Sequence, residues 1–195
     1  MSTRAPHRRS SRSARVLRVG DFARYDLDRR GRTGLPEVIL GEGKSPEHLV
    51  QILWGLHADG HGAVISRITA AQLRRLRPER EAGLPLTFLA GGRVAQLAGP
   101  VPKAPPGVVA ILTAGTADVP VAEEARAVLR GLGVEVRVAY DVGVAGLHRL
   151  LGALRTLARV DPDVFIAFAG REGALPTVLA GLVRAPVIAV PTSVG

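Results

Sequence analysis

The second half of the chain has a regular pattern of apolar and polar positions. Short runs of Val, Ile, Ala and Phe without a polar face alternate with longer segments in which apolar residues recur every three or four positions. The first pattern is typical of strands buried on both faces, and the second of helices packed on a sheet. This βαβαβαβ order predicts a parallel sheet between helices, a three-layer α/β domain. The expected strands are 108–115, 135–140, 163–170 and 186–190, and the expected helices are 121–133, 145–160 and 175–183.

The last predicted strand has no helix after it. Every earlier strand leads into a helix that covers the sheet, whereas strand 186–190 leads only into Pro-Thr-Ser-Val-Gly. We therefore expect one face of that strand to be uncovered and the chain to be a piece of a longer protein, although a terminal edge strand would give the same ending. The predicted inward residues are Val121, Ala125, Val128, Leu129 and Leu132 in the first helix and Leu147, Leu150, Leu151, Leu154 and Leu157 in the second.

Upstream lies the pattern of a smaller α/β unit. Short apolar runs at 37–40 and 63–66 predict strands, and two more strands flank a Gly-Gly turn at 91–92. Ser45 and Thr69 stand at the N-cap positions of two helices. A proline-rich stretch then predicts a stiff linker. The predicted organisation is a disordered basic tail at 1–20, a small α/β N-terminal domain at 21–100, the linker at 101–107 and a flavodoxin-like domain at 108–195.

The net charge of +9 is concentrated at the start of the chain. Residues 1–20 hold six arginines and no acid, while the remaining 175 residues carry 20 basic and 17 acidic groups. This balance does not predict a nucleic-acid-binding surface, and the tail is expected to be a solvated leader. An arm that binds nucleic acid and a transit peptide are its alternatives. Without a secretory segment or an apolar stretch of membrane-spanning length, we expect a soluble, cytoplasmic protein.

Several kinds of site are disfavoured by the sequence. The chain has no cysteine, which removes disulfides, thiolate metal sites and a thiol nucleophile from these residues. The stretch GEGKS at 41–45 resembles a phosphate-binding loop, but Val38 stands where such a loop needs glycine, and Pro46 removes a backbone donor. Lys44 remains as a single anion contact. The sequence predicts no metal–histidine site, because no other possible metal ligands stand at suitable spacing from His48, His57 and His61.

Glycine-bearing loops follow all four strands of the predicted parallel sheet. Such loops meet at the carboxyl edge of the sheet, where ligands bind. The N–H groups of Gly115, Thr116 and Ala117 precede a helix and can cradle a phosphate. Asp118 either caps that helix or holds a ribose hydroxyl or a metal. The four loops are 114–120, 140–148, 169–176 and 191–195.

Two further residues at this edge have both a structural and a functional interpretation. Glu172 begins the next helix, where the helix dipole stabilises a carboxylate, but its Gly-flanked loop favours a role in the active site. His148 is either an ordinary histidine on the polar side of its helix or a proton carrier or phosphate contact at the crevice.

The same loops, in the same order, resemble a known family. AGTADVPVAEEA, YDVGVAGLHRLL, AGREGALPTVLAGLV and PVIAVPTSVG are similar to the carboxylase-like domain of LarB, the synthase that begins nickel-pincer cofactor assembly. That domain is related to the PurE-type aminoimidazole ribonucleotide carboxylase of purine synthesis. GLPEVILGEGKSPEHL resembles the N-terminal region of the synthase, which the purine enzyme lacks. The resemblance covers about 35–195 and implies a PurE-like carboxylase domain at 108–195.

The resemblance also implies an activity. The synthase carboxylates the pyridinium ring of nicotinic acid adenine dinucleotide with carbon dioxide or bicarbonate and hydrolyses the phosphoanhydride, giving pyridinium-3,5-biscarboxylic acid mononucleotide and AMP. Mg²⁺ is implied for the hydrolytic half, and a homo-oligomer is implied for the full-length enzyme. An electron-poor pyridinium ring cannot attack carbon dioxide until a nucleophile has added to it. The family's nucleophile is a cysteine downstream of PTSVG, so we expect this chain, which has none, to be inactive.

Eleven residues match the family's site. Ala117 departs from the family, which usually has Ser there, so one hydroxyl contact is in doubt. One alternative function is the purine-pathway aminoimidazole ribonucleotide carboxylase/mutase, although the long N-terminal region and YDVGVAGLH disfavour it. Another is a non-enzymatic nucleotide-binding module with an Arg-rich nucleic-acid-binding tail. The resemblance implies catalytic roles for Glu172 and Asp118 and substrate contacts for Gly115, Thr116, Tyr140, Asp141, Gly143, His148, Gly170, Thr192 and Ser193.

Overall fold

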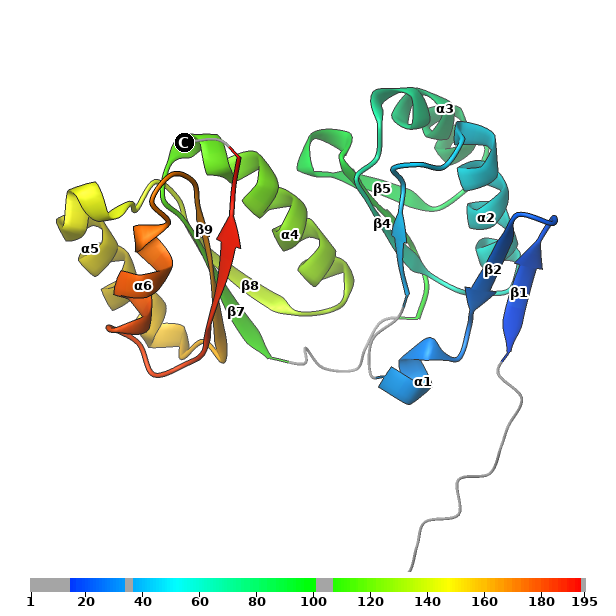
Figure 1. The fold of residues 1–195 in the computed structure, drawn as a ribbon. Helices are drawn as coiled ribbons and strands as arrows, with labels where there is room; N and C mark the ends of the chain where they lie inside the picture. The colour runs from blue at the N-terminus through cyan, green and yellow to red at the C-terminus, as the bar shows by residue number, and fades with distance from the viewer. Residues whose placement is uncertain (1–14, 34–36, 101–106, 194–195) are drawn as a thin grey trace, which may run out of the picture.

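The computed structural model describes residues 15–33, 37–100 and 107–193, which form two α/β units (Figure 1). The first unit contains β1 (Val16–Val19), β2 (Ala23–Asp26), α1 (Arg29–Thr33), β3 (Val38–Leu40), α2 (Pro46–Ala58), β4 (Ala63–Ser66), α3 (Ala70–Glu81), β5 (Leu86–Leu89), η1 (Ala90–Gly92) and β6 (Val94–Leu97). β1 and β2 form an antiparallel hairpin, and the other strands form a sheet in the order β3-β4-β6-β5. Only β3 and β4 run parallel in that sheet.

Both predicted N-caps of the first unit are confirmed. The Ser45 hydroxyl accepts the His48 N–H at 3.1 Å, and Pro46 occupies the first turn of α2, where no N–H is needed. Thr69 and Gln72 form a capping box at the start of α3, each side chain accepting the backbone N–H of the other. These local bonds fix where the two helices begin.

The second unit is the predicted parallel sheet. It contains β7 (Val108–Thr113), η2 (Thr116–Asp118), α4 (Val119–Gly131), β8 (Glu135–Ala139), η3 (Val144–Gly146), α5 (Leu147–Leu157), η4 (Ala158–Val160), β9 (Val164–Ala169), α6 (Ala174–Ala180) and β10 (Val187–Pro191). The strand order is β10-β9-β7-β8, and every pair is parallel. The flavodoxin-like fold class predicted from the alternating pattern is therefore confirmed.

Helices cover this sheet on both faces, which gives three layers. Figure 1 shows α4 on one side of the sheet and α5 and α6 on the other. Ile111 and Phe168 are buried on the α4 side. Leu112 is buried on the opposite side, against Leu150 of α5 and Leu175 of α6. No helix in the described part of the chain combines the length and the hydropathy needed to cross a membrane.

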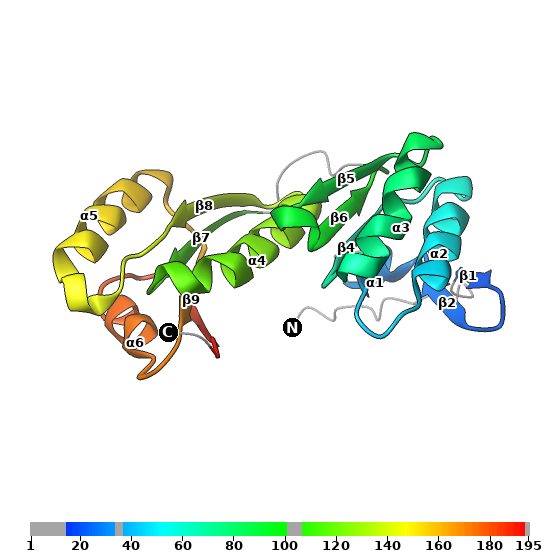
Figure 2. The same ribbon diagram turned by 90° about the horizontal axis from the view of Figure 1, so that it is seen from above.

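Helix α4 is shared by the two units. Its Ala127 packs with Val64 and Val94 of the first sheet in one apolar cluster, and Figure 2 shows α4 between the two sheets. Glu124, on the same helix, accepts the backbone N–H of Arg67 at 3.2 Å and the Nε of Arg93 at 3.0 Å. The helix that covers one face of the parallel sheet thus also fastens the first unit to it.

The structure corrects the predicted domain boundaries at one point. Residues 16–19, assigned to the disordered tail, form strand β1, because they pair with β2, and Leu17 and Val19 pack on α2. The six arginines dominate the composition of residues 1–20, so composition alone did not indicate this short apolar pattern. The predicted linker 101–107 lies outside the described residues except for Gly107, as does the tail up to residue 14.

The inward faces of the two long helices are narrower than predicted. Val121 of α4 is 40% exposed, and Leu147 and Leu151 of α5 are 47% and 37% exposed. The buried residues of α4 are Ala122 and Ala127, because this helix packs on both sheets. In α5 they are Leu150 and Leu157, so the outer members of the predicted arc face solvent. The uncovered face of the last strand is confirmed by Ile188, which is 51% exposed although its register partner Ile166 packs on the α4 side of the sheet.

Replacing Glu124 tests the link between the units. Glu124→Ala removes the acceptor of two hydrogen bonds, and because the side chain is only 14% exposed, we expect a loss of about 1–2 kcal/mol in the free energy of unfolding. The control is Glu135→Ala, which removes a carboxylate paired only with the exposed Arg137 and should cost less than about 0.5 kcal/mol. Urea unfolding measures both, and equal losses would contradict the assignment.

Candidate functional site

Four loops meet at one edge of the parallel sheet. Because all strands of the sheet run in the same direction, the loops that follow β7, β8, β9 and β10 lie at a common carboxyl edge, the upper edge of the left-hand unit in Figure 1. We call this edge the rim. It comprises residues 114–118, 140–143, 170–173 and 191–193.

Asp118 joins the first rim loop to the last. Its side chain is buried, and its two carboxylate oxygens have different partners. Oδ2 accepts the Gly115 N–H at 2.9 Å, and Oδ1 accepts the hydroxyl of Thr192 at 2.6 Å. The Thr192 N–H in turn donates to the Ala169 carbonyl at 3.0 Å. Asp118 therefore organises the rim by bonding back to Gly115, and it does not cap α4 with its side chain.

The second rim loop is bonded to the end of β7. The hydroxyl oxygen of Thr113, fully buried, accepts the Asp141 N–H at 3.0 Å. The Gly143 N–H donates to the Ala114 carbonyl at 2.9 Å. A Cβ at Gly143 would lie 2.6 Å from that carbonyl oxygen, so only glycine permits so close an approach. The first and second loops are thus held in fixed positions relative to each other.

Tyr140 is held by two residues of α4. Its hydroxyl donates to a Glu123 carboxylate oxygen, which also accepts Nη1 of Arg126 at 2.9 Å. Burial, and then the hydrogen bond to Glu123, raises the pKa of Tyr140. Burial opposes the ionisation of Glu123, but the hydrogen bonds from Tyr140 and Arg126 outweigh it and lower the pKa of that carboxyl. The phenol is therefore a neutral hydrogen-bonding group at neutral pH.

Glu172 stands at the tip of the third rim loop. The Gly170 carbonyl accepts the Gly173 N–H at 2.9 Å, which closes a tight turn around Arg171 and Glu172. Both Arg171 and Gly173 have positive φ, 37° and 61°. The Glu172 side chain is exposed and has no hydrogen-bond or ion-pair partner among the described residues. Its carboxylate is thus available to a ligand.

The other predicted site residues are also at or beside the rim. Thr116 and Ser193 are exposed on the first and last loops. His148 is exposed at the second position of α5, just beyond the second loop. Asp141, on that loop, forms an ion pair with Arg149. The structure brings all the predicted residues to one edge, and their contacts with a ligand stay predictions.

The rim does not fit a metal centre built from protein ligands. Among the described residues, no group of three or more His, Cys, Asp or Glu side chains could hold a metal ion. The oxygens of Asp118 are occupied, and Asp141 is paired with Arg149. Mg²⁺ often takes only one or two carboxylates and completes its shell with water and substrate phosphates. Magnesium for the hydrolytic half of the reaction stays a prediction.

Sequence reasoning missed four residues that shape the rim. Thr113 carried a usable signal, since it is the hydroxyl residue inside an otherwise apolar run. Glu123 and Arg126 are spaced i,i+3 on one helix face, which also predicts that they pair. The ion pair of Arg149 with Asp141 spans two elements, and no local pattern indicates it.

Two family models match the chain, in the order of its two units. The LarB/PurE-like N-terminal domain matches residues 16–84, which include the hairpin and most of the first unit. The AIR carboxylase model matches residues 108–195, which include the four parallel strands and the rim. The second unit therefore carries the enzymatic domain.

Two curated proteins of Methanocaldococcus jannaschii are similar to the chain. An uncharacterised protein is 40% identical over 187 residues, which cover 90% of this chain and 70% of the relative. The N5-carboxyaminoimidazole ribonucleotide mutase is 38% identical over 85 residues, 43% of this chain and 52% of the mutase. Together with the domain matches, these relatives indicate carboxylase- or mutase-like chemistry at the level of the family. The chain belongs to the LarB/PurE family, with a LarB/PurE-like N-terminal domain ahead of an AIR carboxylase domain.

Proposed function

We propose that the protein belongs to a synthase that carboxylates the pyridinium ring of nicotinic acid adenine dinucleotide and hydrolyses its phosphoanhydride. The products are pyridinium-3,5-biscarboxylic acid mononucleotide and AMP, and the carboxyl group comes from carbon dioxide or bicarbonate. A LarB/PurE-like N-terminal domain ahead of the carboxylase domain supports this over a purine-pathway role. The observation that supports the proposal is the bond from Thr192 to Asp118, which joins the first and last loops of the rim.

The first loop provides the phosphate contact. The N–H groups of Thr116 and Ala117 precede α4 and have no acceptor among the described residues. α4 is 13 residues long, so its N-terminal partial positive charge adds to these donors. The bond from Gly115 to Asp118 orients this loop without using either N–H. The dinucleotide's phosphates are placed here.

The third loop provides the base. Carboxylation of a ring carbon forms a carbon–carbon bond to carbon dioxide and releases the proton that the ring carbon held. Glu172 is an exposed carboxylate without a partner among the described residues, so it can accept that proton. His148 lies beyond the second loop and would carry the proton to solvent or contact a phosphate. Tyr140 donates its one O–H to Glu123, so its oxygen would accept a hydrogen bond from a ribose hydroxyl.

The ring must first become electron-rich, and this chain does not supply the group that achieves this. A sulfur nucleophile adding to the pyridinium ring gives an enamine that can attack carbon dioxide. Once the ring proton is lost, the carbon–sulfur bond breaks, and the sulfur leaves as a thiolate to restore the pyridinium. The 195 residues include no cysteine. Within the proposal, these residues bind and orient the dinucleotide and accept the ring proton.

A purine-pathway carboxylase or mutase is the second candidate. The chain is similar to the mutase over 85 residues, about the length of the second unit, and this similarity favours the purine-pathway function. Aminoimidazole ribonucleotide is already enamine-like, so that reaction needs no sulfur nucleophile. The 16–84 match to a LarB/PurE-like N-terminal domain favours the dinucleotide instead.

Removing the Asp118 carboxylate tests the rim. Asp118→Ala leaves the Gly115 N–H and the Thr192 hydroxyl without their partner, so we expect a stability loss of about 3 kcal/mol and binding of the dinucleotide weakened about tenfold or more. The matched control is Asp163→Ala. Asp163 accepts the Val108 N–H at the opposite edge of the sheet, at 2.8 Å, so its loss should cost about 1 kcal/mol and leave binding unchanged. Calorimetric titration of both variants decides, and equal weakening would contradict a site at the rim.

Turnover separates the two candidate functions. We expect the 195-residue protein to bind nicotinic acid adenine dinucleotide without transferring label from bicarbonate to the pyridinium ring, because no sulfur nucleophile is present. Labelled pyridinium product, detected by chromatography and scintillation counting, would contradict the need for a sulfur nucleophile. Turnover of aminoimidazole ribonucleotide or its N5-carboxy form by the same sample would favour the purine-pathway enzyme.

A further inference from the structure

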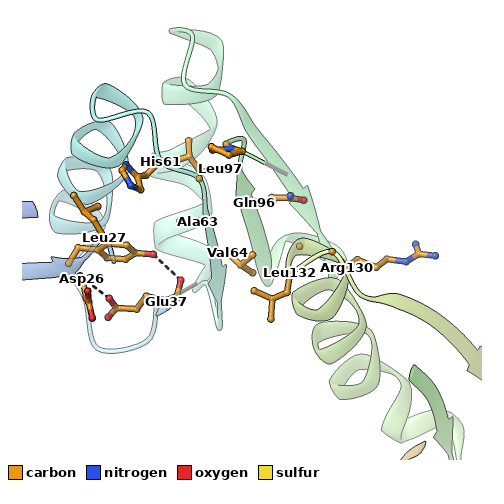
Figure 3. A pocket seen from close by; sticks show the side chains of 16 residues that line it. Asp26, Leu27, Glu37, His61, Ala63, Val64, Gln96, Leu97, Arg130 and Leu132 are labelled. Atoms are coloured by element: carbon orange, nitrogen blue, oxygen red, sulfur yellow. Dashed lines mark hydrogen bonds between the residues drawn. The ribbon is translucent and has the colours of Figure 1, made fainter. Parts of the chain in front are cut away.

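A cavity separate from the rim lies where the first unit meets the end of α4 (Figure 3). Its volume is about 280 Å³. The walls come from residues 25–27, Glu37, 61–64, 96–97 and 130–133, together with Gly99 and Pro100 after β6. α4 has 13 residues, a length of about 20 Å. The cavity and the rim therefore lie at opposite ends of the same helix.

Much of the wall is apolar. Leu27 contributes from the hairpin side, Val64 and Leu97 from the first sheet, and Leu132 from the turn after α4 (Figure 3). Val64 and Leu97 are buried, so the sheet side of the wall is fixed by the core of the first unit. Such a wall suits a short hydrocarbon chain, while the few polar groups determine which head group fits.

Glu37 and the last turn of α4 leave hydrogen-bond acceptors at the cavity, beside the Gln96 amide, which offers both donors and an acceptor. Glu37 accepts the Asp26 N–H at 3.2 Å through Oε2, and its Oε1 has no partner among the described residues. The backbone carbonyls of Gly131 and Leu132 likewise accept no hydrogen bond within the described part of the chain. They stand at the C-terminus of α4, where the helix dipole is negative. The cavity thus offers a carboxylate and the negative end of a helix.

Cationic groups also border the cavity, and Arg29 lies close enough to act electrostatically on Tyr25 and Asp26. The Arg32 guanidinium is already bonded to Asp26, with Nη1 at 3.0 Å from Oδ1. Arg130 is exposed, and its side chain extends away from the other lining residues in Figure 3. Nδ1 of His61 faces Asp59, 2.9 Å from the carbonyl oxygen and 3.0 Å from Oδ2. No cationic side chain of the described residues therefore bonds to Glu37.

We propose that this cavity binds a small organic cation, an ammonium or guanidinium group on a short apolar chain. The cationic head contacts Glu37 and the carbonyls that end α4, and the chain lies on Val64 and Leu132. A bare metal ion does not fit, because no cluster of three possible ligand side chains exists among the described residues. The site is independent of the proposed function, since it uses none of the rim residues.

The test uses the 195-residue protein and agmatine, which carries an amine and a guanidine on a four-carbon chain. Titration is followed through the methyl NMR signals of Val64 and Leu132. We expect saturable shifts at millimolar agmatine or below. Glu37→Gln keeps an acceptor for the Asp26 N–H and removes the charge, so it should weaken binding about tenfold or more. The control is Glu42→Gln, which changes an exposed carboxylate paired with Arg67 outside the cavity.

Each outcome decides for or against the site. Shifts confined to the cavity methyls, weakened in Glu37→Gln and unchanged in Glu42→Gln, support the proposal. No shift at millimolar agmatine, equal binding by Glu37→Gln, or the same response to 1-pentanol, which has no charge, would overturn it. Circular dichroism and the melting temperature confirm that both variants fold. Binding of nicotinic acid adenine dinucleotide at the rim, measured on the same samples, should be the same in all three proteins.

Discussion

A buried carboxylate determines the geometry of the rim. Asp118 is 1% exposed, and a charge so buried is tolerated only when hydrogen-bond donors replace the water it has lost. Gly115 provides one donor from the first loop of the rim, and Thr192 provides the other from the last loop. The need to satisfy one charge therefore holds together segments 74 residues apart. It also leaves the N–H groups that follow Gly115 free for a phosphate.

Helix α4 carries this constraint into the first unit. Its N-terminal end adjoins Asp118, its middle packs on Val64 and Val94 through Ala127, and its last turn borders the cavity at the junction. A Cβ on Gly131 would lie 2.6 Å from a methyl carbon of Val64, which shows how closely the helix approaches the first sheet. The N-terminal unit thus has a structural role, because it fixes the helix that begins at the rim.

The sequence was informative wherever the determining interaction is local. Apolar periodicity predicted the four parallel strands, and Ser45 and Thr69 identified two helix starts, because capping acts within one turn. Parallel topology then placed the site residues at one edge. The bond between Asp118 and Thr192 could not be predicted, since it joins distant loops. The exposure of Leu147 depends on how much of α5 the sheet covers, which periodicity does not specify.

We propose that the rim, and not the cavity at the other end of α4, holds the dinucleotide. The most direct measurement is a two-dimensional amide NMR titration of the 195-residue protein with nicotinic acid adenine dinucleotide. The account predicts the largest shifts at Gly115, Thr116 and Gly170, with His61 and Gly133 unmoved. Shifts concentrated at His61 and Gly133, with the three rim amides unchanged, would contradict it.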